Sequence, residues 1–200
     1  MKYLLIISLL TLLTGCLGLD SNLISDKTTY GPNVSLAVGQ YLAQYETVDD
    51  LPIMTPVYGH PYTFSDTDTL AFNISDSFDS RENIVSILLQ FDIINRFPAD
   101  IQVKLYYIDE NGTDIYLTAG DGIELVAAVL NEQGEVFSQN GTLTNFMLQE
   151  DQIDGLMTTD KVVVEVGFID FILTPEIRAN FNEYMVLTDL GVQSQLIFED

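Results

Sequence analysis

The chain has 200 residues, of which 47% are hydrophobic, and a formal net charge of −23 from 30 acidic and 7 basic side chains. The apolar fraction is enough for a folded core, so the composition excludes a disordered chain. A surface this negative repels phosphate backbones, which argues against nucleic acid as a partner.

The N-terminal residues predict an export signal that ends in a lipid-attachment site. Lys2 supplies a positive charge, and the apolar run over residues 3–13 is too short to cross a bilayer as a mature helix. The run closes in Leu13-Thr14-Gly15-Cys16, which resembles the bacterial lipobox, where the cysteine is lipidated and the preceding peptide is removed. We therefore expect residues 1–15 to be a signal peptide and Cys16, the only cysteine, to carry a lipid anchor. The alternatives are a plain secretory signal and an uncleaved anchor helix.

The residue after Cys16 indicates which membrane holds the anchor. In the enterobacterial sorting scheme an aspartate at this position keeps a lipoprotein in the inner membrane, and here the position is Leu17. The resemblance thus implies the outer membrane, on either its periplasmic or its outer face. With Cys16 consumed by lipid, the mature body would have no disulfide, no cysteine nucleophile and no zinc–sulfur site.

Residues 16–60 are expected to form a lipidated tether that leads into the first elements of the domain. The pattern over residues 34–39 predicts a short strand, and residues 41–45 predict one helical turn. Regular structure is then interrupted by Pro52, Pro56 and Pro61.

From residue 61 to residue 200 the sequence predicts a β-sandwich domain. Every second residue is predominantly apolar, as in strands with one buried face, over residues 69–74, 101–107, 162–168 and 192–198. Residues 84–94 are so apolar that we expect a central strand, buried on both faces for part of its length. A break is expected at residues 95–98, because Pro98 cannot donate to a β-ladder.

Turns and one helix complete the expected domain. Asn and Gly tolerate the positive φ of tight turns, and they predict turns at residues 109–112, 131–134 and 140–141. Apolar residues recur at helical spacing over residues 149–157, which predicts a helix that Gly155 weakens. Short strands between turns, without βα alternation, predict an all-β fold: an antiparallel β-sandwich with one short helix, preceded by the signal peptide and an irregular tether.

Several short segments carry a family resemblance. They are Leu13–Cys16, Gly31–Gly39, Asn95–Val103, Tyr107–Gly112 and Leu190–Leu196. Together they resemble a large group of uncharacterised outer-membrane lipoproteins of Bacteroidetes. The motif Asn95-x-x-Pro98, followed by a strand and Asp109-x-x-Gly112, is also similar to the β-sandwich of late-embryogenesis-abundant-like domains. Both resemblances imply a sandwich, the first implies the outer membrane, and neither brings a catalytic residue.

Two acidic segments are candidates for metal binding. Asp66 and Asp68 lie in Ser-Asp-Thr-Asp, and Asp76 and Asp79 lie in Ser-Asp-Ser-Phe-Asp. This alternation of carboxylates and hydroxyls can supply hard oxygen ligands to calcium, the one cofactor that the sequence suggests. Neither segment matches the EF-hand loop, and the alternative is a solvated loop between strands.

Candidates for catalysis are few. His60, the single histidine, lies between Gly59 and Pro61 and is expected to be a loop residue, whereas catalytic triads need a histidine with partners. Paired carboxylates could serve a glycosidase, but among 30 acidic residues some pair meets that spacing by chance. With 10 tyrosines and no tryptophan, carbohydrate contact would fall to tyrosine. Thr69, in Asp-Thr-Leu, resembles an O-glycosylation acceptor of Bacteroidetes, or is simply a strand residue.

These observations predict an outer-membrane lipoprotein with a non-catalytic structural or interaction role in the cell envelope, and not an enzyme. Its expected partners are the membrane, through the lipid on Cys16, and an envelope protein. The alternatives are a ligand-binding module for glycan, lipid or a calcium-bridged polymer and, third, a carboxylate-dependent envelope hydrolase, which would need two carboxylates with divergent pKa values in a cleft.

Overall fold

The structure, a computed structural model, describes residues 29–31, 33–44, 57–72, 74 and 80–199. Within these residues the strands form two antiparallel sheets that pack face to face. The expected fold class, an all-β antiparallel sandwich, is confirmed.

The first sheet has four strands. Their order across the sheet is β10 (Asn140–Met147), β4 (Ile84–Asn95), β12 (Met185–Leu196) and β2 (Asn33–Gln44). Because β2 precedes residue 61, one strand of the sandwich comes from the segment expected to hold the tether and the first elements.

The second sheet has five strands. Four lie in the order β3 (Pro61–Ala71), β11 (Lys161–Ile172), β5 (Asp100–Ile108) and β6 (Asp114–Tyr116), and β7 (Ile123–Leu125) also pairs with β5. Two short pairs lie outside the main sheets, β1 (Thr29–Tyr30) with β13 (Phe198–Glu199) and β8 (Val129–Leu130) with β9 (Val136–Ser138).

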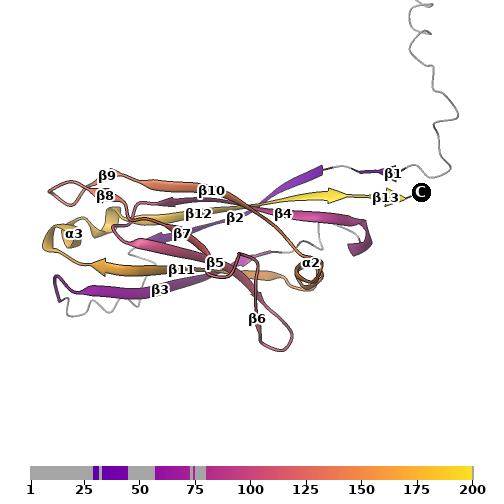
Figure 1. Ribbon diagram of the computed structural model, residues 1–200, viewed down its shortest axis with the longest axis horizontal. Helices are drawn as coiled ribbons and strands as arrows, with labels where there is room; N and C mark the ends of the chain where they lie inside the picture. Colours follow the sequence, from indigo (N-terminus) through magenta and orange to yellow (C-terminus); the bar gives the residue numbers. More distant parts are fainter. Residues whose placement is uncertain (1–28, 32, 45–56, 73, 75–79, 200) are drawn as a thin grey trace, which may run out of the picture.

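Short helical segments lie between the strands. They are η1 (Arg81–Asn83), α2 (Glu150–Leu156), α3 (Pro175–Ala179) and η2 (Phe181–Glu183). Figure 1 shows the two layers edge-on, with α3 beside one end of the sandwich and α2 near the other. No helix among the described residues is long and apolar enough to span a membrane.

The core lies between the two sheets and follows the period-two alternation of the strands. On β5 the inward side chains Ile101, Val103 and Leu105 are buried, as predicted. The expectation that residues 84–94 are buried on both faces for part of their length is wrong, because every second residue from Ser86 to Ile94 is half-buried or exposed. β4 is an inner strand of its sheet, but only one of its faces is buried throughout, because the other looks away from the second sheet and exposes Gln90 and Asp92.

The chain passes from the first sheet to the second at Asn95, a fully buried polar residue at the end of β4. Its Oδ1 accepts a hydrogen bond from the Phe97 N–H at 2.8 Å. Its Nδ2 donates to the carbonyl oxygens of Ala99 at 3.0 Å and Val126 at 2.9 Å. Every polar atom of the side chain therefore has a partner, and together the three bonds fix the corner before β5.

This corner places Phe97 inside an aromatic cluster at one end of the core. The ring centroid of Phe97 lies 4.7 Å from that of Phe168, 5.1 Å from Phe171 and 5.5 Å from Phe181. Tyr184 joins the cluster at 5.8 Å and donates its hydroxyl hydrogen to the Gly134 carbonyl. Tilted and edge-on ring pairs at these separations stabilise a core beyond the area that they bury.

Two of the three predicted turns are confirmed. Gly112 and Gly134 close them with φ of 79° and 84°, a left-handed backbone that favours glycine. The turn predicted at residues 140–141 is wrong, because Asn140 and Gly141 begin β10 and pair with Asn95 and Ile94. The helical turn predicted at residues 41–45 is also wrong as far as the structure describes it, because β2 continues through Gln44 against β12.

The predicted helix is confirmed as α2, and Gly155 has a packing reason to be there. A Cβ at this position would overlap the hydroxyl and ring of Tyr107, which lies against the helix. Glycine lowers the helix propensity of this segment, but the missing side chain lets α2 and β5 approach each other closely. The second short helix, α3, was not predicted, although Thr174 caps it and Pro175 begins it.

We predict that Asn95→Asp destabilises the fold by about 3 kcal/mol, because the carboxylate keeps the shape but removes both N–H donors and leaves the buried Ala99 carbonyl and the partly buried Val126 carbonyl without this partner. The free energy of unfolding in urea measures this loss. The matched control is Asn145→Asp on the exposed face of β10, which should change stability by less than about 0.5 kcal/mol. Equal losses in the two variants would contradict the role given to Asn95.

Candidate functional site

The predicted lipidation site lies outside the described residues. This holds for Leu13, Thr14, Gly15 and Cys16, and also for the calcium candidates Asp76 and Asp79. These sites stay predictions from the sequence.

The other two calcium candidates lie on β3, on the face that carries Phe64 and Leu70. Asp66 Oδ2 accepts a hydrogen bond of 2.6 Å from the Tyr41 hydroxyl, and Asp68 Oδ1 accepts one of 2.7 Å from the Thr69 N–H. Among the residues that the structure describes, no group of three or more His, Cys, Asp or Glu side chains could hold a metal ion. Within this part of the chain the two carboxylates accept hydrogen bonds, Asp66 from Tyr41 on the opposite sheet and Asp68 from the next residue.

The bond from Tyr41 to Asp66 closes a seam between β2 and β3, which are edge strands of opposite sheets. Gly39 contributes to the same seam, since a Cβ there would lie 3.6 Å from the Leu70 side chain. Burial raises the pKa of Tyr41, and the hydrogen bond to Asp66 and the charges of Asp66 and Asp68 raise it further. Tyr41 is therefore a neutral donor at physiological pH.

Beyond Leu70 the seam widens into a small pocket of about 220 Å³. Its lining side chains are apolar: Leu36, Ala37, Val38, Ala71, Phe72, Ile74 and Val192. Ligand sites for drug-sized molecules usually enclose roughly 300 Å³ or more. The pocket can take a small apolar group, and none of the described residues that line it is titratable.

His60 lies in the exposed loop before β3, as expected. The tyrosines beside it bind elsewhere: the Tyr62 hydroxyl contacts the backbone N and O of Val57, both at 3.0 Å, and the Tyr58 hydroxyl accepts from Arg178 at 3.2 Å. These contacts hold the loop, and none of them gives His60 a catalytic partner.

The outer face of the five-stranded sheet carries a pair of tyrosines. Tyr106 on β5 and Tyr116 on β6 are cross-strand neighbours, with ring centroids 5.3 Å apart and ring planes inclined by 49°. Beside them Lys104 and Glu165 approach to 3.9 Å. Burial, together with the charges of Asp114 and Glu165, raises the pKa of Tyr106, which keeps its hydroxyl protonated.

The strongest exposed feature is the edge strand β10, which sequence reasoning missed. Leu143 and Met147 on its outer face are 61% and 56% exposed, and Phe137 on the preceding β9 is 79% exposed. No charged residue occurs between Glu135 and Glu150 in a chain of such high net charge, and this run is the signal that could have found the strand.

The backbone of β10 is paired on one side only among the described residues, with β4. Phe146 is opposite Leu89, and one step further along the ladder the Leu148 N–H donates to the Ile87 carbonyl at 2.9 Å. In an antiparallel pair every second residue bonds to the partner strand and the residues between point away. The N–H and C=O groups of Leu143, Asn145 and Met147 therefore face the open side.

A carboxylate that forms no ion pair with any described residue lies beside this edge. Asp92 on β4 is the partner of Leu143 in the ladder and is directly opposite Asp189 on β12. Asp189 accepts a hydrogen bond from Gln40 Nε2 at 2.8 Å, but no described residue forms an ion pair or hydrogen bond with Asp92. Like charges directly opposite each other on a sheet are destabilising, so this face favours an added positive charge.

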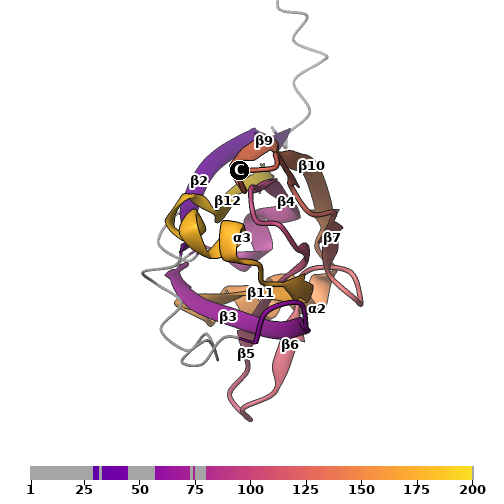
Figure 2. The same cartoon turned by 90° about the vertical axis from the view of Figure 1, so that its left-hand side faces the viewer.

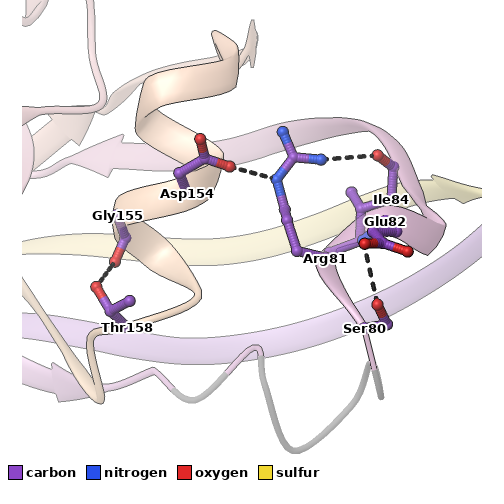
Figure 3. Close-up of polar contacts among 7 residues, drawn as sticks. All are labelled: Ser80, Arg81, Glu82, Ile84, Asp154, Gly155 and Thr158. Atoms are coloured by element: carbon purple, nitrogen blue, oxygen red, sulfur yellow. Dashed lines mark hydrogen bonds and ion pairs between the residues drawn. The ribbon is translucent and has the colours of Figure 1, made fainter.

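Helix α2 bounds the edge at its C-terminal end. Figure 3 shows how the helix is tied down: Arg81 Nε binds Asp154 Oδ1 at 2.5 Å, and the same guanidinium donates to the Ile84 carbonyl at 3.1 Å at the start of β4. The Thr158 hydroxyl closes the helix end by donating to the Gly155 carbonyl at 2.8 Å. Because α2 is held in place, the chain directly after the open stretch of β10 has a fixed position.

No protein-family model and no curated protein sequence matches the chain. Among solved structures, it is similar to a protein of Parabacteroides distasonis inferred to be secreted, with 9% identity over 67% of this chain and 38% of that one and a TM-score of 0.45. The enzymatically active domain of tailspike protein 4 from bacteriophage CBA120 gives 10% identity, 86% and 20% coverage, and a TM-score of 0.33.

A third similar structure is TmCBM61 in complex with β-1,4-galactotriose, with 7% identity over 92% of this chain and 94% of that one and a TM-score of 0.29. This chain spans well under half of the first two proteins. Similarities at this level carry no information about function, so the functional argument has to come from the chain itself.

We predict that stability falls as the pH rises above about 10, the pKa of tyrosine in an unfolded chain. Burial raises the pKa of Tyr184 to about 12 and raises that of Tyr41 as well, so both phenols stay protonated in the fold while the unfolded chain loses those protons. The stabilisation is complete below pH 10 and is lost as the pH approaches the folded pKa. Urea unfolding at about pH 8 and about pH 11 measures the loss.

Tyr41→Phe should reduce this pH dependence, and it should lower stability at neutral pH by about 1 kcal/mol, because Asp66 loses its donor. The control is Tyr58→Phe in the exposed loop, which should change stability at neutral pH by less than about 0.5 kcal/mol. An unchanged pH slope in Tyr41→Phe would contradict the assignment.

Proposed function

We propose that this chain is a lipoprotein held to the outer membrane by lipid on Cys16, and that its sandwich binds another envelope protein and catalyses no reaction. The observation that carries the interaction role is the open edge of β10, an uncharged strand whose own Leu143 and Met147 side chains are exposed.

Proteins usually protect the edges of their sheets with proline, inward-pointing charge or bulges. β3, one edge of the second sheet, has all three: it starts at Pro61, carries Asp66 and Asp68 on its inward face, and has a bulge in its pairing with β11. β10 has none of them. An unprotected edge on an exported protein supports a role in binding a partner.

The proposed lipid anchor would also favour binding to another envelope protein. A lipid on Cys16 confines the sandwich to the membrane surface, where the effective concentration of a partner in the same membrane is high. A modest interface is then enough for a stable complex.

The test is site-specific crosslinking in the native envelope. A photo-reactive amino acid in place of Leu143 should give one discrete covalent adduct, whereas the same group in place of Ile108, equally exposed but on the other sheet, should give none. Cys16→Ser should release the protein from the membrane fraction and weaken the adduct. Lone monomer at both positions, in cells where the protein stays membrane-bound, would contradict the interaction role and leave the anchor intact.

A second candidate function is glycan binding, which the Tyr106 and Tyr116 pair favours. Aromatic rings on an exposed sheet face can stack on the apolar face of a sugar ring, and the adjacent Lys104 and Glu165 can hydrogen-bond its hydroxyls. The proposal predicts that neutral oligosaccharides at millimolar concentration shift the NMR signals of these tyrosines. Tyr116→Ala should abolish the shift, while Tyr58→Ala should retain it, and no shift with any neutral oligosaccharide would remove this candidate.

A further inference from the structure

We propose that β10 accepts an extended segment of a partner protein as an additional antiparallel strand, and that this segment is basic, with a Lys or Arg that reaches Asp92. The inference rests on the proposed interaction role and names the partner's chemistry.

The backbone of β10 provides the pairing. Leu143, Asn145 and Met147 point their N–H and C=O groups to the open side, because the residues between them bond to β4. Main-chain hydrogen bonds of this kind give affinity for any extended chain, and side chains of alternate residues give the specificity. A bound strand would extend the first sheet from four strands to five.

The register of the β10–β4 ladder determines which side chains lie next to an added strand. On the outer face, Leu143 and Asp92 occupy the same row of the ladder, and Met147 and Leu88 occupy another. A residue of the added strand opposite Leu143 would lie about 10 Å from the Asp92 backbone, two strand spacings away. A Lys or Arg side chain can cover that span with its aliphatic stem on Leu143 and its charge at the carboxylate.

Charge explains why the partner should be basic. Asp92 is opposite Asp189 and has no ion pair among the described residues, so a cation there relieves a repulsion and satisfies an unpaired group. Both ends of the uncharged strand are also acidic, with exposed Glu135 before β9 and exposed Glu150 and Asp151 at the start of α2. These charges would attract a segment with basic flanks and orient it on the edge.

The same charges disfavour a second copy of this chain. Two β10 strands could pair edge to edge, but each copy would bring its own Asp92, its own acidic strand ends and a net charge of −23. β2, the other edge of the sheet, is a weaker candidate, because it carries no large exposed hydrophobic side chain and contacts β3 across the closed seam.

The test uses the mature lipidated protein in detergent micelles and two backbone-cyclised β-hairpin peptides. The outer strand of each peptide alternates threonine and valine, and its central residue is lysine in one peptide and glutamate in the other. The lysine peptide should bind about tenfold more tightly, because an ion pair replaces a repulsion. Asp92→Asn should remove this preference and keep residual binding, while Asp114→Asn, the same change of charge on the second sheet, should preserve it.

Leu143→Pro tests the pairing itself. Proline is tolerated where the N–H faces away from the sheet, so the fold should persist while binding of both peptides is lost. Circular dichroism and the urea midpoint check the fold, and Leu143→Lys, which keeps the N–H but repels the basic peptide, provides a second variant.

Four outcomes would overturn the inference. Equal affinity for the two peptides, or a preference that survives Asp92→Asn, would show that Asp92 does not select the partner. A homodimer in sedimentation that Leu143→Pro dissociates would make the second copy the occupant. No peptide binding, in a protein whose residue 143 still crosslinks to an envelope partner, would refute strand addition and leave the proposed function standing.

Discussion

The side-chain amide of Asn95 makes three hydrogen bonds where the chain leaves one sheet and enters the other, and the sandwich depends on this corner. β4 ends at Asn95 and β5 begins at Asp100, so a few residues connect the two layers. The corner also inserts Phe97 among the rings of Phe168, Phe171 and Phe181. All hydrogen-bonding groups of this buried amide have partners. Another arrangement of the two sheets would break these bonds and bury unpaired polar groups, so the amide favours the observed arrangement.

Joining two open sheets in this way leaves edge strands on both sides, and the two sides differ. Figure 2, which looks along the sandwich, shows β2 and β3 on one side and β10 and β7 on the other. The β2–β3 side is closed by the hydrogen bond from Tyr41 to Asp66 and by Leu70 against Gly39. On the other side β10 contacts β7 but pairs with no described strand except β4. The proposed interaction role follows from this asymmetry.

Much of the fold could be predicted from the sequence. The alternation at Ile101, Val103 and Leu105 gave β5 its buried face, and glycines with positive φ at residues 112 and 134 lie where turns were expected. The errors come from tertiary contacts that override local signals. Asn140 and Gly141 have the composition of a turn, but the ladder with β4 keeps them extended, and Tyr41 is held in a strand by β12.

The candidate site was harder to predict, for a physical reason. An open edge is a property of strand order, and strand order depends on which distant segments pair, which one-dimensional periodicity does not encode. Asp66 shows the same limit: it was singled out as a calcium ligand for its neighbours in sequence, whereas its hydrogen-bond partner, Tyr41, lies in another sheet. The predicted lipidation motif at Cys16 is the opposite case, because it is a continuous local pattern that can be recognised from the sequence alone.

The most direct test of the account is residue-resolved amide hydrogen exchange along β10. If the edge is open, the N–H groups of Leu143, Asn145 and Met147 should exchange much faster than those of Thr142, Thr144 and Phe146, which bond to β4. Equal protection of all six amides in the isolated protein would show that the edge is covered, and it would contradict the account.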